Sequence, residues 1–189
     1  MRPAVLALPA CASILLISCH PSPPALPDYG VVPEFQLTDQ QDRPFDSRAL
    51  DGNVWVADFF YTTCASICPR MTSQMHQVQS ALSRTAHVRL VSFTVDPKRD
   101  TPAVLADYAR VYHALPEMWY FLTGPQPDLQ RLDRDVFKLG NVDGTLTHSS
   151  RFVLVDDRGH IRGYYDTSEE SSIPQLVRDV HRLLRDRSA

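Results

Sequence analysis

The sequence predicts an α/β sandwich with a mixed central sheet, built as one domain. Apolar runs rich in β-branched and aromatic residues, at 54–61, 88–95 and 119–123, are typical of buried strands. Segments with helical apolar spacing alternate with these runs, as in α/β proteins. The chain has 189 residues and is 43% hydrophobic and 22% charged, which suits one domain with a sizeable core. A net charge of −3 gives no reason to expect nucleic acid as a partner.

The remaining elements complete this fold. Residues 35–39 alternate apolar and polar side chains, and 42–45 turns the chain back, so an N-terminal hairpin precedes the first buried strand. Helices are expected at 70–82, at 102–112, around 129–136 and after Pro174. A second hairpin is expected from strands 151–155 and 161–165, and we expect the former to be an edge strand.

The N-terminus has the pattern of a lipoprotein signal peptide. Residues 1–18 carry one positive charge, at Arg2, and then an apolar run too short and too interrupted for a confident membrane span. Leu16–Cys19 resembles a bacterial lipobox, with Cys19 as the lipidated residue; an uncleaved anchor or a plain secretory peptide is the alternative. Residues 19–33 are Pro-rich and predict a semi-extended tether, followed by the domain at 34–189. We therefore expect lipid anchoring on the extracytoplasmic face of a bacterial cell envelope.

A lipoprotein signal peptide would leave one pair of free thiols in the mature protein. Of the four cysteines, Cys11 leaves with the signal peptide and Cys19 carries lipid, so Cys64 and Cys68 remain. Thiols outside the cytoplasm tend to be oxidised. A pair kept there is a disulfide, a metal site, or both in alternation.

The thiol pair follows a buried strand directly. If a helix begins near Cys64, positions i and i+4 place both sulfurs on one helical face. A strand that enters a helix bearing paired thiols in its first turn is a thioredoxin-like arrangement, and a helix N-terminus favours the thiolate. The order of the elements then predicts a thioredoxin-like sandwich with an added N-terminal hairpin and an insertion. Three residues separate the cysteines, where the usual redox motif has two. The wider spacing indicates that metal binding matters as much as disulfide exchange.

Two thiolates and one imidazole make a good donor set for copper. Of the seven histidines, His148 stands apart, because it lies in a loop at the start of a strand and is flanked by small hydroxyl residues. The other histidines are interpreted as solvated. Met71 and Met75 could be copper ligands, but their spacing favours the core face of a helix.

Three motifs in order resemble the Sco/SenC family: the segment from Phe59 to Pro69 with its two cysteines, the Asp-Pro-x-x-Asp-Thr-Pro segment at 96–102, and Thr147-His148-Ser149 before a strand. The resemblance covers the chain from about Pro33 onward. It implies a thioredoxin-like, membrane-tethered copper chaperone that helps assemble the binuclear copper centre of cytochrome c oxidase.

Matched by position, Cys64 and Cys68 are the redox-active copper ligands and His148 is the histidine ligand. Asp96 and Asp100 could tune the site or orient a partner; alternatively they form a strand-end turn and a helix cap. Thr147 departs from the family pattern, in which a valine-aspartate pair commonly precedes the histidine.

Two functions from different classes remain open. One is copper delivery to the copper-bearing oxidase subunit or to another copper chaperone, which involves no turnover. The other is thiol-disulfide reduction that keeps the client's copper-site cysteines reduced. We favour delivery, because a pure reductase has no use for His148; a peroxidase would need neither this histidine nor a second cysteine. Nothing in the sequence predicts an obligate dimer, so we expect a monomer.

Overall fold

The computed structural model describes residues 24–140 and 149–187 and contains a seven-stranded sheet with the order β2-β1-β5-β4-β3-β6-β7. The strands are β1 Gln36–Asp39, β2 Pro44–Asp46, β3 Val54–Phe60, β4 Val88–Thr94, β5 Trp119–Thr123, β6 Arg151–Val155 and β7 Ile161–Asp166. The helices are α1 Cys68–Leu82, α2 Pro102–Val111, α3 Gln126–Arg131 and α4 Ser172–Asp186, with a 3₁₀ turn at Ser47–Leu50 and a π-helical turn at Leu132–Val136.

The sheet is mixed, as predicted. β3, β4 and β5 are parallel, whereas β6 pairs antiparallel with β3 and β1 pairs antiparallel with β5. The two predicted hairpins form, as β1–β2 and β6–β7. The prediction that 151–155 is an edge strand was wrong, because β6 lies between β3 and β7. The return strand β7 takes the edge instead.

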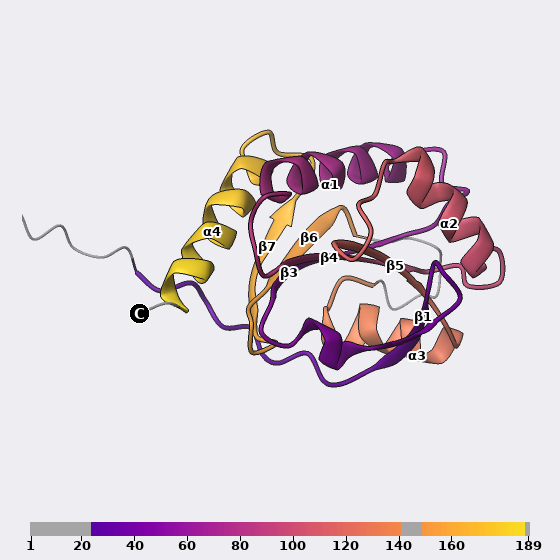
Figure 1. Cartoon of the computed structure of the whole chain (residues 1–189), viewed down its shortest axis with the longest axis horizontal. Helices are drawn as coiled ribbons and strands as arrows, with labels where there is room; N and C mark the ends of the chain where they lie inside the picture. The colour runs from indigo at the N-terminus through magenta and orange to yellow at the C-terminus, as the bar shows by residue number, and fades with distance from the viewer. Residues whose placement is uncertain (1–23, 141–148, 188–189) are drawn as a thin grey trace, which may run out of the picture.

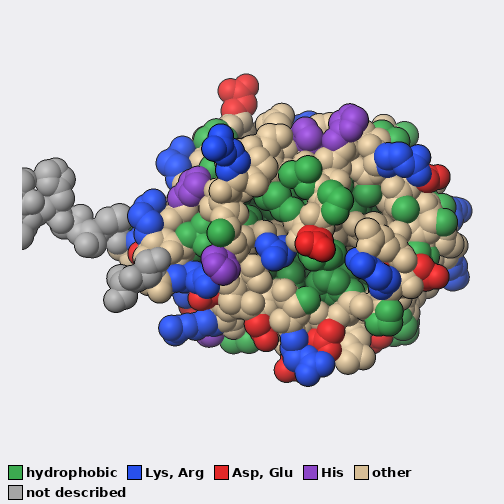
Figure 2. Space-filling view, viewed as in Figure 1, with side chains coloured by type: hydrophobic (Ala, Val, Ile, Leu, Met, Phe, Trp, Pro, Cys, Tyr) green, Lys and Arg blue, Asp and Glu red, His purple; other side chains and the backbone are tan. Residues whose placement is uncertain are grey.

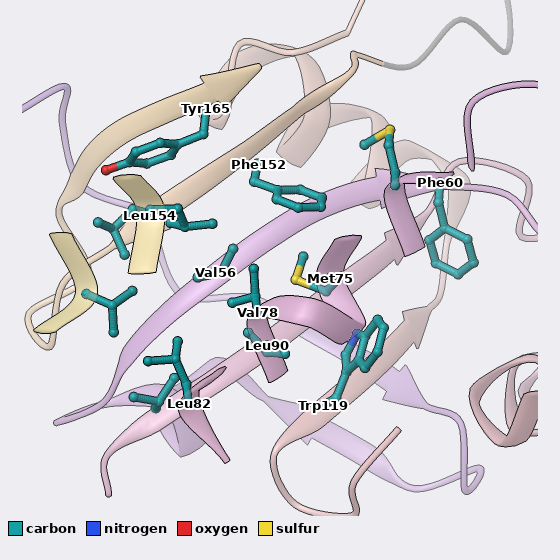
Figure 3. Close-up of a cluster of buried hydrophobic side chains, with 14 of the residues drawn as sticks. Val56, Phe60, Met75, Val78, Leu82, Leu90, Trp119, Phe152, Leu154 and Tyr165 are labelled. Atoms are coloured by element: carbon teal, nitrogen blue, oxygen red, sulfur yellow. The ribbon is translucent and has the colours of Figure 1, made fainter. Parts of the chain in front are cut away.

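Helices cover both faces of the sheet (Figure 1). α1, α2 and α4 lie on one side and α3 on the other. All seven residues of β3 are buried, and alternate side chains enter the two cores. On the α1 side, Met75 and Val78 pack with Val56, Phe152 and other apolar side chains (Figure 3). Met71 is also fully buried in this core, so both methionines are packing residues, as predicted.

One predicted helix face needs correction. The face expected for α2 was Val104, Leu105, Tyr108 and Val111. Leu105 is fully buried, but Val104 is 38% and Val111 is 69% exposed. The helix packs through Leu105 and Ala109, one turn apart, and through Tyr108, whose ring stacks on Phe60. The two valines face solvent. Thr101 is the N-cap and accepts a hydrogen bond from the Val104 N–H.

The first described residues lie along β7 and α4. Val31 forms a bridge with His160, and the Tyr29 N–H donates to the carbonyl of Ile161 at 2.9 Å. Arg182 on α4 donates to the carbonyl of Pro24. These contacts place Pro24 beside α4. Within 24–140 and 149–187, no helix has both the length and the apolar composition needed to cross a bilayer.

Candidate metal and redox centre

The thiol pair lies where two parallel strands end. β3 ends at Phe60 and leads through a loop to Cys68, the first residue of α1. β4 ends at Thr94, next to β3, and is followed by the turn that contains Asp96 and Asp100. In open α/β sheets, sites form at the carboxyl ends of the strands, where loops from neighbouring strands meet. The fold therefore brings two of the three sequence motifs to one edge of the sheet.

α1 begins at Cys68, two residues before the predicted range of 70–82 and four residues after Cys64. Cys68 is the first residue of α1 and Pro69 follows it, because proline is favoured in the first helical turn, where its missing N–H is not needed. Cys64 lies in the preceding loop, where its N–H donates to the carbonyl of Tyr61 at 3.2 Å. The condition for placing both cysteines on one helical face, a helix that begins near Cys64, is therefore not met.

The two thiols nevertheless contact each other. Neither cysteine forms a disulfide; Cys64 is 6% exposed and Cys68 is fully buried. Burial raises the pKa of Cys68, and hydrogen bonding with Cys64 raises it further. A backbone hydrogen bond from Tyr61 acts in the opposite direction, but burial dominates. The expected preference of the helix N-terminus for a thiolate is thus outweighed at Cys68, which is a neutral thiol at pH 7.

This pKa shift predicts a pH dependence of stability in the reduced protein. The folded state keeps the Cys68 proton at pH values where the unfolded chain, with a thiol pKa of about 8.5, loses it. Stability is therefore unaffected below about pH 8.5 and falls as the pH rises, by at most about 1.4 kcal/mol per pH unit.

The test is urea unfolding of the reduced protein between about pH 7.5 and 9.5, below the ordinary tyrosine pKa of about 10. Cys68→Ala is the matched control, because it removes this proton and leaves Cys64 in place. Parallel pH profiles for the two proteins would contradict the assignment of the effect to Cys68.

Asp100 fastens the loop that carries Cys64. Its side chain is fully buried and accepts hydrogen bonds from the Thr62 N–H at 3.1 Å, the Thr62 hydroxyl at 2.5 Å and the Thr94 hydroxyl at 2.5 Å. It is not the cap of α2, which is Thr101. The contacts support a structural role for Asp100, which stabilises the loop between β3 and α1 that carries Cys64.

Asp96 has a different environment. Its carboxylate pairs with Arg99 at 2.7 Å, and its carbonyl accepts the N–H groups of Arg99 and Asp100. The Arg99 side chain is 65% exposed, so this ion pair lies at the surface. Asp96 thus forms the strand-end turn that was one of its two predicted roles.

Some predicted residues lie outside the described part of the chain. His148, Thr147 and Cys19 are among them, so the histidine ligand and the lipidation site stay predictions. Across 24–140 and 149–187, no group of three or more His, Cys, Asp or Glu residues is placed to hold a metal ion.

Two neighbours of the thiols, Asp58 and Tyr61, were not predicted from the sequence. Asp58 is 1% exposed on β3, and its charge contributes to the raised pKa of Cys68. A carboxylate inside an apolar strand was the available signal. The pKa of Tyr61 is raised, chiefly by a hydrogen bond with Cys64 and then by burial. Nothing in the sequence distinguished this tyrosine from the other aromatic residues of the run.

The profile of the SCO1/SenC family matches residues 24–185. The "SCO1 protein homolog" of Bacillus subtilis is 33% identical over 159 residues, covering 81% of this chain and 82% of the relative. A "putative copper-binding protein" of Stutzerimonas stutzeri is 33% identical over 150 residues, covering 74% of this chain and 71% of the relative.

Solved structures agree with the fold. A SCO1/SenC family lipoprotein from Bacillus anthracis has a TM-score of 0.74 and 31% identity, with 82% of this chain and 95% of that one covered. BsSco, described as having a disulfide switch and as a member of the Sco family of cytochrome c oxidase assembly proteins, has a TM-score of 0.73 and 32% identity, with 84% and 95% covered.

Copper-bound ScoI from Bradyrhizobium japonicum has a TM-score of 0.66 and 23% identity, covering 82% of this chain and 99% of that one, and supports the thioredoxin-like fold alone. The profile match, the curated relatives and the fold together show that the chain belongs to the SCO1/SenC family.

Proposed function

We propose that this protein is a copper chaperone that binds copper through Cys64, Cys68 and His148 and passes it to the copper centre of cytochrome c oxidase. The observation that carries the proposal is the contact between two thiols that form no disulfide: Cys64 in the loop before α1, which is 6% exposed, and Cys68 at the start of α1, which is fully buried. Soft sulfur ligands in a buried setting suit Cu(I), and an added imidazole lets a site also hold Cu(II). A relative described as copper-binding supports copper as the cargo, and a relative described as an oxidase assembly protein supports cytochrome c oxidase as the client.

The burial of Cys68 determines the protonation state of its thiol before copper binds. Because the pKa of Cys68 is raised, this thiol keeps its proton at neutral pH. It loses the proton when copper binds to the sulfur. Copper binding therefore releases a proton from Cys68. Transfer then proceeds by ligand exchange, in which thiolates of the client replace those of Cys64 and Cys68.

A second function uses the same thiols. In the reduced protein, one thiolate attacks a client disulfide and forms a mixed disulfide; the other thiol then releases the reduced client and leaves a Cys64–Cys68 disulfide. Two electrons pass from this protein to the client. The disulfide switch described for BsSco favours keeping this alternative.

The test is the visible spectrum of the reduced full chain after addition of one equivalent of Cu(II). We expect intense sulfur-to-copper charge transfer in the native protein and its loss in His148→Ala, because the imidazole is needed for a stable Cu(II) site. His181→Ala, a histidine on α4, is the control and should leave the spectrum unchanged. A native protein that forms no stable copper complex but reduces a client disulfide quickly would favour the reductase.

We also propose that lipid on Cys19 anchors the chain at the extracytoplasmic face of the membrane. The lipobox pattern and the lipoprotein relative from Bacillus anthracis support this. Cys19→Ala in the producing cell should move the chain from the membrane fraction to the soluble fraction. Unchanged membrane association of that variant would contradict lipid anchoring.

A further inference from the structure

Two histidines from separate elements meet on the surface over α1. His76 lies on α1, eight residues and about 12 Å along the helix axis from Cys68. His113 follows α2, in the loop that leads to β5. Their ring centroids are 6.3 Å apart and their planes are inclined by 61°. Figure 2 shows histidine side chains next to each other on this part of the surface.

A buried glutamine holds both histidines in place. Gln79 is only 2% exposed, and its Oε1 accepts the N–H of Leu115 at 2.7 Å. Its Nε2 donates to the carbonyl of His113 at 3.0 Å and lies 3.3 Å from Nδ1 of His76. His113 has a φ of 52°, a left-handed conformation that few residues adopt without such support. One amide side chain therefore fixes the His113 backbone next to His76.

These contacts also set the proton position on His76. Since Oε1 of Gln79 accepts from Leu115, the other end of the amide is a donor, and Nδ1 of His76 must accept. Nε2 of His76 then carries the proton and faces the Ser80 hydroxyl at 3.5 Å. A metal-binding histidine in proteins usually donates its second ring N–H to a nearby acceptor. His76 is thus in the tautomer that offers Nδ1 to an ion.

We propose that His76 and His113 form a surface site for a divalent transition metal ion, separate from the thiol pair. Metal–nitrogen bonds of about 2.0–2.1 Å, plus about 1.1 Å from each nitrogen to its ring centre, allow ring centres at most about 6.2–6.4 Å apart, and only when the two nitrogens lie on opposite sides of the ion. The observed separation lies at this limit, and the exposed His113 can rotate to shorten it. The 3.3 Å contact of Nδ1 with Gln79 is long for a hydrogen bond, so an ion displaces it at small cost.

The two imidazole ligands determine which ions the site can bind, and they leave coordination positions unfilled. Imidazole ligands suit Cu(II), Zn(II) and Ni(II), and Cu(II) binds most tightly among them. No third His, Cys, Asp or Glu joins the pair among residues 24–140 and 149–187, so water or a group from a partner completes the coordination. The proposal does not depend on the function of Cys64 and Cys68.

The test uses the full chain with the thiols removed by Cys64→Ser and Cys68→Ala. Cu(II) is titrated into this parent and followed by electron paramagnetic resonance, where we expect a signal with nitrogen ligation. Adding His76→Ala and His113→Ala should weaken binding by about 10-fold or more, since even residues behind metal ligands contribute about 10–100-fold.

His181→Ala in the same thiol-free parent is the matched control and should leave the Cu(II) affinity unchanged, because this histidine lies alone on α4. Circular dichroism checks that each variant keeps its fold. Equal Cu(II) affinity and equal nitrogen signals in the parent and in the His76/His113 double variant would overturn the proposal.

Discussion

Replacing Asp100 with alanine should lower the free energy of unfolding of the reduced protein by about 3–4 kcal/mol. The fully buried carboxylate accepts three short hydrogen bonds, two from Thr62 and one from Thr94. Alanine leaves the buried Thr94 hydroxyl and the two half-buried Thr62 donors without their acceptor, and each buried unsatisfied group costs about 1–3 kcal/mol. Since a domain is stable by only about 5–15 kcal/mol, this loss is a large share of the total.

Urea unfolding measures the loss, and Asp96→Asn is the matched control. Asp96 lies four residues away and is itself buried, but its carboxylate pairs with Arg99, whose side chain is 65% exposed to water. Asparagine keeps the size of the side chain, and loss of a pair with one exposed partner costs about 1 kcal/mol. Asp100→Asn keeps the size of the side chain and removes one acceptor, so it should fall between the two. If Asp100→Ala were as mild as Asp96→Asn, the hydrogen bonds to Thr62 and Thr94 would not support the loop as described.

The aspartates illustrate what the sequence could predict at this site. The Asp-Pro-x-x-Asp-Thr-Pro segment was predicted as a turn and the start of a helix, because proline and threonine have strong local preferences. The role of Asp100 depends on Thr62, 38 residues earlier, which local pattern does not reveal. Local pattern does not reveal the role of Asp58 either. Its charge raises the pKa of Cys68 only because β3 and the start of α1 pack together in the fold.

The fold was more predictable than the site. β5 has the predicted bounds, and β3 and β4 each end one residue earlier than predicted, because buried parallel strands are continuous apolar runs. Helix faces were less certain: α2 buries Leu105 as expected, but it also buries Ala109 and leaves Val104 and Val111 exposed. A small residue such as alanine carries little pattern signal, although it lets a helix approach a sheet closely.

Replacing Cys68 with alanine should remove both activities that the thiol pair offers. Copper affinity should fall by more than about 100-fold, because loss of a ligand costs more than the 10–100-fold seen for residues behind ligands. Disulfide exchange should stop after its first step, since Cys64 can form a mixed disulfide with a client but no second thiol is present to release it. A covalent complex with the client's thiols should therefore accumulate.

Competition with a Cu(I) chelator measures the first effect, and mass spectrometry of alkylated protein under non-reducing conditions measures the second. His148→Ala is the comparison: it should weaken copper binding yet leave the mixed disulfide to resolve normally, because the imidazole takes no part in exchange. Copper affinity in Cys68→Ala within a few-fold of the native value would rule out Cys68 as a ligand.

The two variants together separate delivery from reduction. If oxidase assembly in the cell fails with His148→Ala as completely as with Cys68→Ala, the client needs copper from this protein. If His148→Ala supports assembly and Cys68→Ala does not, the client needs electrons from the thiols. Both functions require Cys68, so only the histidine distinguishes them.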